Sequence, residues 1–184
     1  MRLIKQAPLK QCVLDPIPTW LLKDCADLLA PYIMQVINSS LCTGHVPTLL
    51  KQAYITPLLK KPGLDENDVA NYRPVSNLSV LSKLLEKAAS HQIECHLSST
   101  GLFPTHQSAY RKHHSTETAL ARVCSDVIMH LDDGDNSLMA FLDLSAAFDT
   151  VDKQILITRL SRSFGIRGTA LDWFSSYLSD RTQY

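Results

Sequence analysis

The spacing of apolar side chains over the first fifty residues predicts helices. Leucine, isoleucine and valine recur three, four or seven positions apart between residues 21 and 37, as they do on the buried face of a helix. One helix is expected to begin at Thr19, after two prolines, and a second to begin at Pro31, which suits a first helical turn. The second should run to about Leu41 and stop at Gly44.

The next stretch has the pattern of two short strands. Residues 53–60 are expected to form a strand, and Pro57 restricts that strand to an edge or a break. A turn-like segment follows at 61–68. Residues 71–76 should then return in an extended conformation, because the residue before Pro74 is disfavoured in the helical region. The stretch therefore predicts a hairpin.

Capping residues mark four further helices. Ser79 is expected to cap a helix that ends near residue 101, and Ser115 one that ends near residue 132. A third covers residues 156–164 with Gly165 as its C-cap. The fourth is opened in the style of a capping box by Thr169 and Asp172.

Five consecutive apolar residues at 138–142 predict a strand buried on both faces. Asp143 stands at its carboxyl end, where open α/β sheets bind ligands. A strand that ends in a carboxylate is a rigid support for a divalent metal ion. The alternative is that Asp143 only caps the next helix. An aspartyl-phosphate site would need a second aspartate where Ser145 stands, and a Walker A loop is absent from the sequence.

Composition predicts a folded globular chain of one domain, or at most two small ones. The 184 residues are 45% hydrophobic and carry eighteen Lys and Arg against eighteen Asp and Glu. No apolar run approaches the roughly 18 residues of a membrane span, and no secretory signal is evident. We therefore expect an intracellular protein without a membrane partner. Five cysteines without a C-x-x-C pair, and histidines without zinc spacings, disfavour a disulfide framework and a zinc site.

Charge is segregated along the chain. Residues 51–112 carry eight Lys and Arg against five Asp and Glu, residues 126–152 carry seven Asp and no Lys or Arg, and residues 153–184 carry five basic side chains against two acidic ones. An acidic block between basic ones suits a metal-dependent enzyme that acts on a polyanion. Asp132, Asp133 and Asp135 are better explained as a solvated turn around Gly134.

Seven sequence blocks resemble, in order, the reverse transcriptase of LINE-type (non-LTR) retrotransposons, especially the jockey and chicken-repeat-like kinds. They are KKPG at 60–63, NYRPVSNLS at 71–79, KLLEK at 83–87, QSAYR at 107–111, STETA at 115–119, FLDLSAAFDTVD at 141–152 and WFSSYLSDR at 173–181. The resemblance covers about residues 53–184. It implies an α/β (α+β) chain with part of the right-hand polymerase fold: a helical N-terminal extension at 1–50, a fingers-like region at 51–125 and the start of the palm at 126–184.

The resemblance also implies a catalytic centre. Asp143 would be the first catalytic carboxylate and would bind two Mg²⁺ ions, and Leu144 would offer its backbone carbonyl to the second ion. Phe148 matches the aromatic steric gate that excludes a 2′-hydroxyl, with an ordinary core phenylalanine as the alternative. Asp149 and Asp152 are interpreted as helix-start residues rather than metal ligands.

Further roles implied by the resemblance concern the substrates. Lys60, with Lys61 as the alternative, and Arg73 match the fingers residues that bind the triphosphate. Gln107 and Arg111 match the next block, which lies near template and nucleotide, whereas the neighbouring tyrosine could equally be a packing residue. The expected partners are an RNA template, a DNA primer and deoxynucleoside triphosphates.

The expected function is that of an RNA-directed DNA polymerase domain, acting in the nucleus and cytoplasm. The sequence stops before the family's paired-aspartate hairpin and thumb, so we expect these 184 residues to be a truncated part that is inactive alone. A nucleic-acid-binding remnant without chemistry and a decayed fragment without function are the alternatives.

Overall fold

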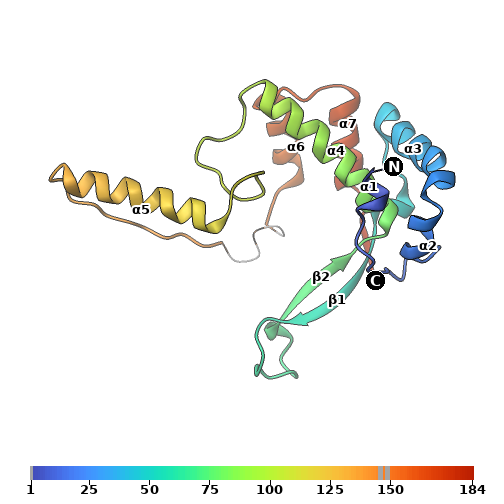
Figure 1. Ribbon diagram of the computed structural model, residues 1–184, viewed down its shortest axis with the longest axis horizontal. Helices are drawn as coiled ribbons and strands as arrows, with labels where there is room; N and C mark the ends of the chain where they lie inside the picture. The colour runs from blue at the N-terminus through green and yellow to red at the C-terminus, as the bar shows by residue number, and fades with distance from the viewer. Residues whose placement is uncertain (1, 145–146, 148–149) are drawn as a thin grey trace. The chain divides into compact units, whose positions relative to one another are not determined.

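The computed structural model describes residues 2–144, 147 and 150–184. The chain forms two compact units, the first made of Met1–His96 with Asp152–Tyr184 and the second of Leu97–Val151. Both helices and strands are present, as the sequence predicts, and Figure 1 labels them.

Most elements belong to the first unit. Its helices and 3₁₀ turns are α1 (Arg2–Lys5), α2 (Thr19–Asp24), α3 (Ala26–Thr43), η1 (Thr48–Lys51), η2 (Val69–Asn71), α4 (Val80–Ser99), α6 (Lys153–Arg162) and α7 (Thr169–Leu178). Its strands are β1 (Gln52–Leu59), β2 (Tyr72–Asn77) and β3 (Thr182–Gln183). The second unit contains α5 (Thr116–Asp132). No helix within the described residues is both long enough and apolar enough to cross a membrane.

The N-terminal helices form as expected, but their boundary does not lie at Pro31. The chain breaks at Cys25, and Pro31 lies inside α3. A proline inside a helix removes one hydrogen bond and costs about 3 kcal/mol. Ala26, Ala30 and Ile33 nevertheless lie buried on one continuous helical face, and their packing favours an unbroken helix.

The end of α3 is confirmed at Gly44. This residue has φ of 67°, in the left-handed region where glycine carries no steric penalty. A Cβ placed there would stand 2.9 Å from the carbonyl oxygen of Thr169, at the start of α7. Glycine therefore serves both the turn and the close approach of α3 to α7.

Two apolar clusters hold the first unit together. One joins the N-terminal helices to the start of α4, and the other joins the middle of α4 to α7. The first consists of Ile4, Ala7, Leu22, Ala26, Ala30, Ile33, Val80 and Leu84. The second consists of Val46, Leu85, Ala89 and Trp173. The two clusters make α4 the central helix of this unit, with α7 beside it in Figure 1.

The start of α4 is capped from two directions. Ser79 Oγ accepts a hydrogen bond from the backbone N–H of Ser82 at 3.2 Å, which confirms Ser79 as the N-cap. Asp15 adds a cap from far along the sequence: its carboxylate accepts from the N–H of Val80 at 2.6 Å and from that of Cys12 at 3.0 Å. A negative charge at this position is also favoured by the helix dipole.

The predicted hairpin is confirmed. β1 pairs antiparallel with β2, with Pro57 opposite Pro74, and β3 adds in parallel on the other edge of β1. The N–H of Lys60 donates to Asn71 O at 2.8 Å, so residues 60 and 71 form a hydrogen-bonded pair. Hydrogen-bonded and non-hydrogen-bonded pairs alternate along an antiparallel ladder, so Pro57 and Pro74 form a non-hydrogen-bonded pair in which neither residue needs a cross-strand N–H. On the outer edge of β1, Ile55 N–H donates to Tyr184 O, and the next position on that edge is Pro57. The prolines therefore keep the hairpin intact while limiting further strand pairing.

In the second unit, one prediction is confirmed and one is wrong. Ser115 caps α5 in a capping box with Thr118. Residues 138–142, expected as a strand buried on both faces, are irregular, and Leu138 and Leu142 are 99% and 95% exposed. A strand needs neighbours for its backbone hydrogen bonds and cover for its faces, and none of the strands in the described part of the chain pairs with this segment.

The two C-terminal helices form, but neither is capped as predicted. The C-cap of α6 is Ser163, and Gly165, with φ of 69°, turns the chain two residues later. The N-cap of α7 is Gly168 without a side-chain hydrogen bond, so Thr169 is the first helical residue and no capping box forms. Asp152 caps α6 by accepting from the N–H groups of Gln154 and Ile155, as expected of a helix-start residue.

Candidate nucleotide-binding site

Two of the predicted triphosphate ligands lie on the β1–β2 hairpin. Arg73 stands directly opposite Leu58 in the register. Lys60 lies one residue past β1, and its backbone N–H donates a hydrogen bond to the carbonyl oxygen of Asn71. Side chains alternate between the faces of a strand, so residues 58, 60, 71 and 73 share one face. Lys60 and Arg73 are then diagonal neighbours, a spacing that long side chains can bridge.

Both cations are exposed and available to a ligand. Lys60 Nζ donates to the carbonyl oxygen of Ala70 at 2.7 Å, which ties its side chain to the hairpin turn. Neither Lys60 nor Arg73 forms an ion pair with a residue that the structure describes. Lys61, the alternative to Lys60, is exposed at the start of the turn. The turn between the strands also carries Asp65, Glu66 and Asp68, but none of them forms an ion pair with Lys60 or Arg73, so both cations are available to a polyphosphate.

The second predicted fingers block is a loop of the second unit. Gln107 Nε2 donates to Ala109 O at 3.1 Å. Arg111 donates to Pro104 O at 3.4 Å, and its guanidinium carbon lies 5.1 Å from the centre of the Phe103 ring. These contacts hold Gln107 and Arg111 within one loop. The neighbouring Tyr110 has φ of 59° and is 88% exposed. A packing role, the alternative considered for this tyrosine from the sequence, does not agree with that exposure.

The predicted catalytic carboxylate is accessible. Asp143 and Leu144 are both exposed and lie in irregular backbone, so the side-chain carboxylate and the backbone carbonyl expected to bind metal are adjacent in the chain. Phe148, the predicted steric gate, and Asp149 lie outside the described residues. Lys60 and Arg73 belong to the first unit, whereas Gln107, Arg111, Asp143 and Leu144 belong to the second.

The predicted metal ligands are the Asp143 carboxylate and the Leu144 backbone carbonyl. Carboxylate and carbonyl oxygens are the hard donors that Mg²⁺ prefers. Within residues 2–144, 147 and 150–184, however, no three His, Cys, Asp or Glu side chains come together in a group that could hold a metal ion. Asp143 therefore has suitable chemistry for one ligand, but the described residues do not assemble a two-ion site around it.

The basic excess of residues 51–112 is smaller at the surface than in the sequence. Lys51 is 3% exposed, and its Nζ donates to Ser176 O at 3.3 Å. It is a structural residue of the first unit and is not available to phosphate. Sequence reasoning missed this because a lysine that ends a short 3₁₀ helix carries no local sign of burial.

The acidic turn is confirmed as a turn. Gly134 has φ of 83°, Asp133 is the C-cap of α5, and Asp135 lies 3.8 Å from His130 Nδ1. These contacts place the cluster at the turn that ends α5.

Comparisons with known proteins agree with the resemblance in the sequence. Residues 59–184 match the reverse transcriptase (RNA-dependent DNA polymerase) family. The chain is 30% identical over 179 residues to a probable RNA-directed DNA polymerase from transposon BS of Drosophila melanogaster, a match covering 97% of this chain and 19% of that protein. It is 31% identical over 166 residues to the RNA-directed DNA polymerase from mobile element jockey of Drosophila melanogaster, covering 88% of this chain and 18% of that protein.

A third relative is the jockey polymerase of Drosophila funebris, 35% identical over 120 residues, which are 65% of this chain and 13% of that protein. The chain thus spans less than a fifth of the length of these relatives. Because the family match extends over more than half of its residues, the chain belongs to the reverse transcriptase family and is related to the enzymes of non-LTR retrotransposons such as jockey and BS.

Proposed function

We propose that this chain forms the fingers and the first palm motif of an RNA-directed DNA polymerase. Residues 51–125 would be the fingers-like region, residues 126–184 the start of the palm, and residues 1–50 a helical extension. The observation that carries the proposal is the hairpin, on which Lys60 and Arg73 share one exposed face without an acidic partner among the described residues. The family match supports it independently.

In this proposal the hairpin binds the triphosphate of the incoming deoxynucleotide. Phosphoryl transfer depends mainly on positioning and on stabilising charge, which a lysine and an arginine on a rigid hairpin supply. Gln107 and Arg111 would contact template or nucleotide. Asp143 and Leu144 would offer oxygen ligands to Mg²⁺, which, when bound, activates the primer hydroxyl and neutralises the phosphates. Phe148 would exclude the 2′-hydroxyl of ribonucleotides.

Nucleotide binding by the chain itself tests the role of the hairpin. We expect fluorescent dATP to bind, and the double substitution Lys60→Ala with Arg73→Ala to weaken binding about tenfold or more, since charge-assisted hydrogen bonds contribute roughly 1.5–3 kcal/mol each. Lys87→Ala changes an exposed lysine of α4 and is the matched control. An unchanged affinity in the double variant, or an equal loss in the control, would contradict the proposal.

A chimaera tests the catalytic roles. The chain would replace the matching segment of the Drosophila melanogaster jockey polymerase, and primer extension would be measured on an RNA template. Asp143→Asn should abolish extension, and Phe148→Ala should raise ribonucleotide incorporation relative to deoxyribonucleotide incorporation. Extension that persists in Asp143→Asn would exclude that residue as a catalytic carboxylate, and an unchanged sugar preference would return Phe148 to an ordinary packing role.

The second candidate function is nucleic-acid binding without chemistry. One observation favours it: no three His, Cys, Asp or Glu side chains among the described residues form a group that could hold a metal ion. A chain that binds RNA with salt-dependent affinity but supports no extension in the chimaera would fit this alternative.

A further inference from the structure

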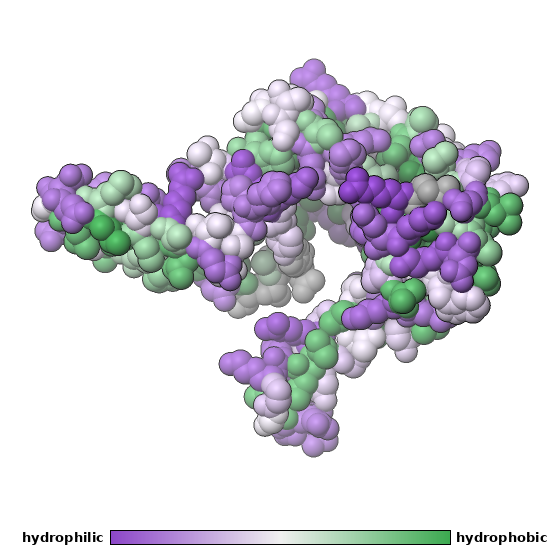
Figure 2. Space-filling model, viewed as in Figure 1, coloured by the Kyte–Doolittle hydropathy of each residue, from purple (hydrophilic) through white to green (hydrophobic). Residues whose placement is uncertain are grey.

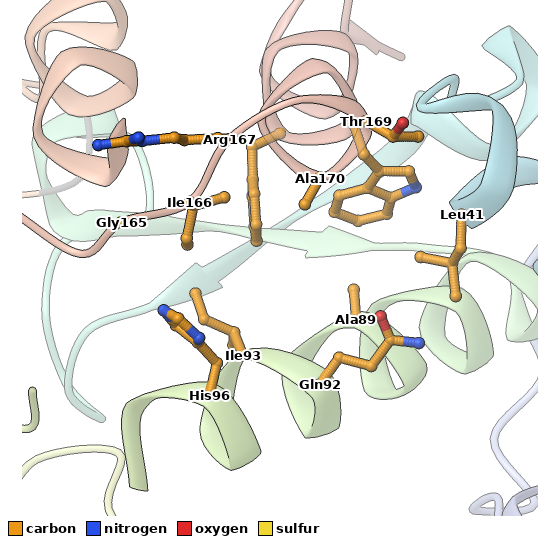
Figure 3. Close-up of a pocket in the computed structure, with 12 residues that line it drawn as sticks. Leu41, Ala89, Gln92, Ile93, His96, Gly165, Ile166, Arg167, Thr169 and Ala170 are labelled. Atoms are coloured by element: carbon orange, nitrogen blue, oxygen red, sulfur yellow. The ribbon is translucent and has the colours of Figure 1, made fainter. Parts of the chain in front are cut away.

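A slot of about 450 Å³ lies in the first unit, between α4 and the segment that joins α6 to α7. Figure 3 shows side chains from the two sides pointing toward one another across it. One wall is a single stripe of α4, made of Ala89, Gln92, Ile93 and His96. The remaining lining residues are Leu41, Gly165, Ile166, Arg167, Thr169, Ala170, Trp173 and Phe174.

The aromatic part of the slot is held in place by its surroundings. Trp173 is 4% exposed, and its ring stacks on Tyr177 with centroids 5.2 Å apart and planes 8° apart. The indole N–H donates to Ser40 Oγ at 3.1 Å. On the opposite wall, His96 Nε2 donates to Phe164 O at 2.7 Å, which fastens α4 to the end of α6. A slot fixed on both walls exists before any ligand arrives, which lowers the cost of binding.

The polar groups of the slot favour an anion. Gln92 offers an amide and Arg167 a guanidinium, and none of the lining residues is acidic. Arg167 is exposed and forms no ion pair with any residue in the described part of the chain. The volume is within the range of about 300–1,000 Å³ that is typical of small-ligand sites, which combine apolar walls with a few polar groups.

We propose that this slot binds a planar aromatic anion. The ring would lie between the α4 stripe and the side chains of Trp173 and Phe174, where apolar contacts stabilise it. The anionic group would lie at the Arg167 end of the slot. Gln92 lies toward the other end in Figure 3, where its amide would donate to a polar atom of the ring. Two sources share this chemistry: an aromatic carboxylate or sulfonate, and a nucleotide, whose base and phosphate supply the ring and the charge. The slot is separate from the hairpin and does not depend on polymerase activity.

The test uses 1-anilinonaphthalene-8-sulfonate as the probe and Trp173 as the reporter. The chain has two tryptophans, so Trp20→Phe, a change at an exposed residue, leaves Trp173 as the only one. In this parent variant we expect energy transfer from Trp173 to the bound probe. Ala170→Phe should fill the slot and lower the affinity at least about tenfold, and Arg167→Gln should lower it roughly three- to tenfold.

Arg162→Gln is the matched control, because Arg162 is an exposed arginine of α6 outside the lining. Far-ultraviolet circular dichroism establishes that each variant is folded. If Ala170→Phe does not fold, the probe affinities of Arg167→Gln and Arg162→Gln still test the proposal. Equal affinity in these two arginine variants, or no energy transfer in the parent, overturns the proposal. Displacement of the probe by adenosine 5′-monophosphate supports a nucleotide as the ligand. If adenosine 5′-monophosphate does not displace the probe, but Ala170→Phe and Arg167→Gln still weaken its binding, the ligand is a non-nucleotide aromatic anion.

Discussion

Tyr177 and Glu86 form a hydrogen bond between α7 and α4, with the phenol donating to Glu86 Oε1 at 2.6 Å. Burial, followed by this bond to a carboxylate, raises the pKa of Tyr177 to about 12. Arg181, whose guanidinium carbon lies 4.6 Å from the centre of the Tyr177 ring, opposes the shift. At the scale of single residues, contacts of this kind fasten α7 to the central helix.

The raised pKa predicts a specific loss of stability in alkali. Because the folded-state pKa exceeds the ordinary value of 10.0, the contribution of Tyr177 is complete below about pH 10 and is lost as pH rises toward about 12. Tyr177→Phe should therefore abolish part of the decline in the free energy of unfolding over that interval, measured by urea denaturation. Tyr32→Phe, at an exposed residue of α3, should not. Ionisation of all six tyrosines together near pH 10 in the folded protein would contradict the assignment.

At the scale of elements, α4 and α5 are helices of similar length with different support. α4 buries Leu84, Leu85 and Ala89 and is capped by Asp15 and Ser79. α5 has no buried residue along its length and depends on its own hydrogen bonds and on the Ser115 capping box. Isolated helices of this length are marginally stable in water.

Hydrogen exchange should separate these helices. We expect the amides of α5 to exchange much faster than those of central α4, and Ser115→Ala to speed exchange in α5 roughly fivefold, since losing an N-cap costs about 1 kcal/mol. Mass spectrometry of peptides from both helices provides the measurement. Ser90→Ala, in the exposed part of α4, is the control. Equal protection in the two helices would show that α5 has tertiary support in solution.

At the scale of the whole molecule, exposed apolar side chains concentrate in the second unit. They include Leu120, Val123, Ile128, Met129 and Leu131 on α5, and Leu138, Phe141, Leu142 and Leu144 after it. Figure 2 shows hydrophobic surface along α5 beside polar residues. Contiguous exposed apolar surface promotes association between protein molecules.

We expect the isolated chain to self-associate as its concentration rises. The combined substitution Phe141→Asp and Leu142→Asp should increase the monomer fraction in size-exclusion chromatography with light scattering, because charged side chains resist burial in an interface. Leu49→Asp changes a residue of the first unit that is 75% exposed, and it should have little effect. A monomer at all concentrations would mean that the apolar surface is covered in solution.

The family and the features that depend on near neighbours could be predicted from the sequence. Ser79 and Ser115 as caps and Gly44 as a helix end follow from interactions within a few residues. The hairpin around its two prolines follows from two strands that are neighbours in the sequence. The family follows from ordered motifs in the same way, because each motif is a local string. The roles of Phe148 and Asp143 remain predictions of the same origin.

Features that depend on residues distant in the sequence became apparent only in the folded chain. α3 continues through Pro31 because one of its faces packs in the core, and Lys51 is buried and does not contribute to the charged surface. The segment at 138–142 has the composition of a central strand, but apolar residues form one only when other strands pair with it. The shared face of Lys60 and Arg73 depends on register, and the slot depends on three helices meeting. Each depends on which residues come together in the fold, and a local stretch of sequence does not specify those neighbours.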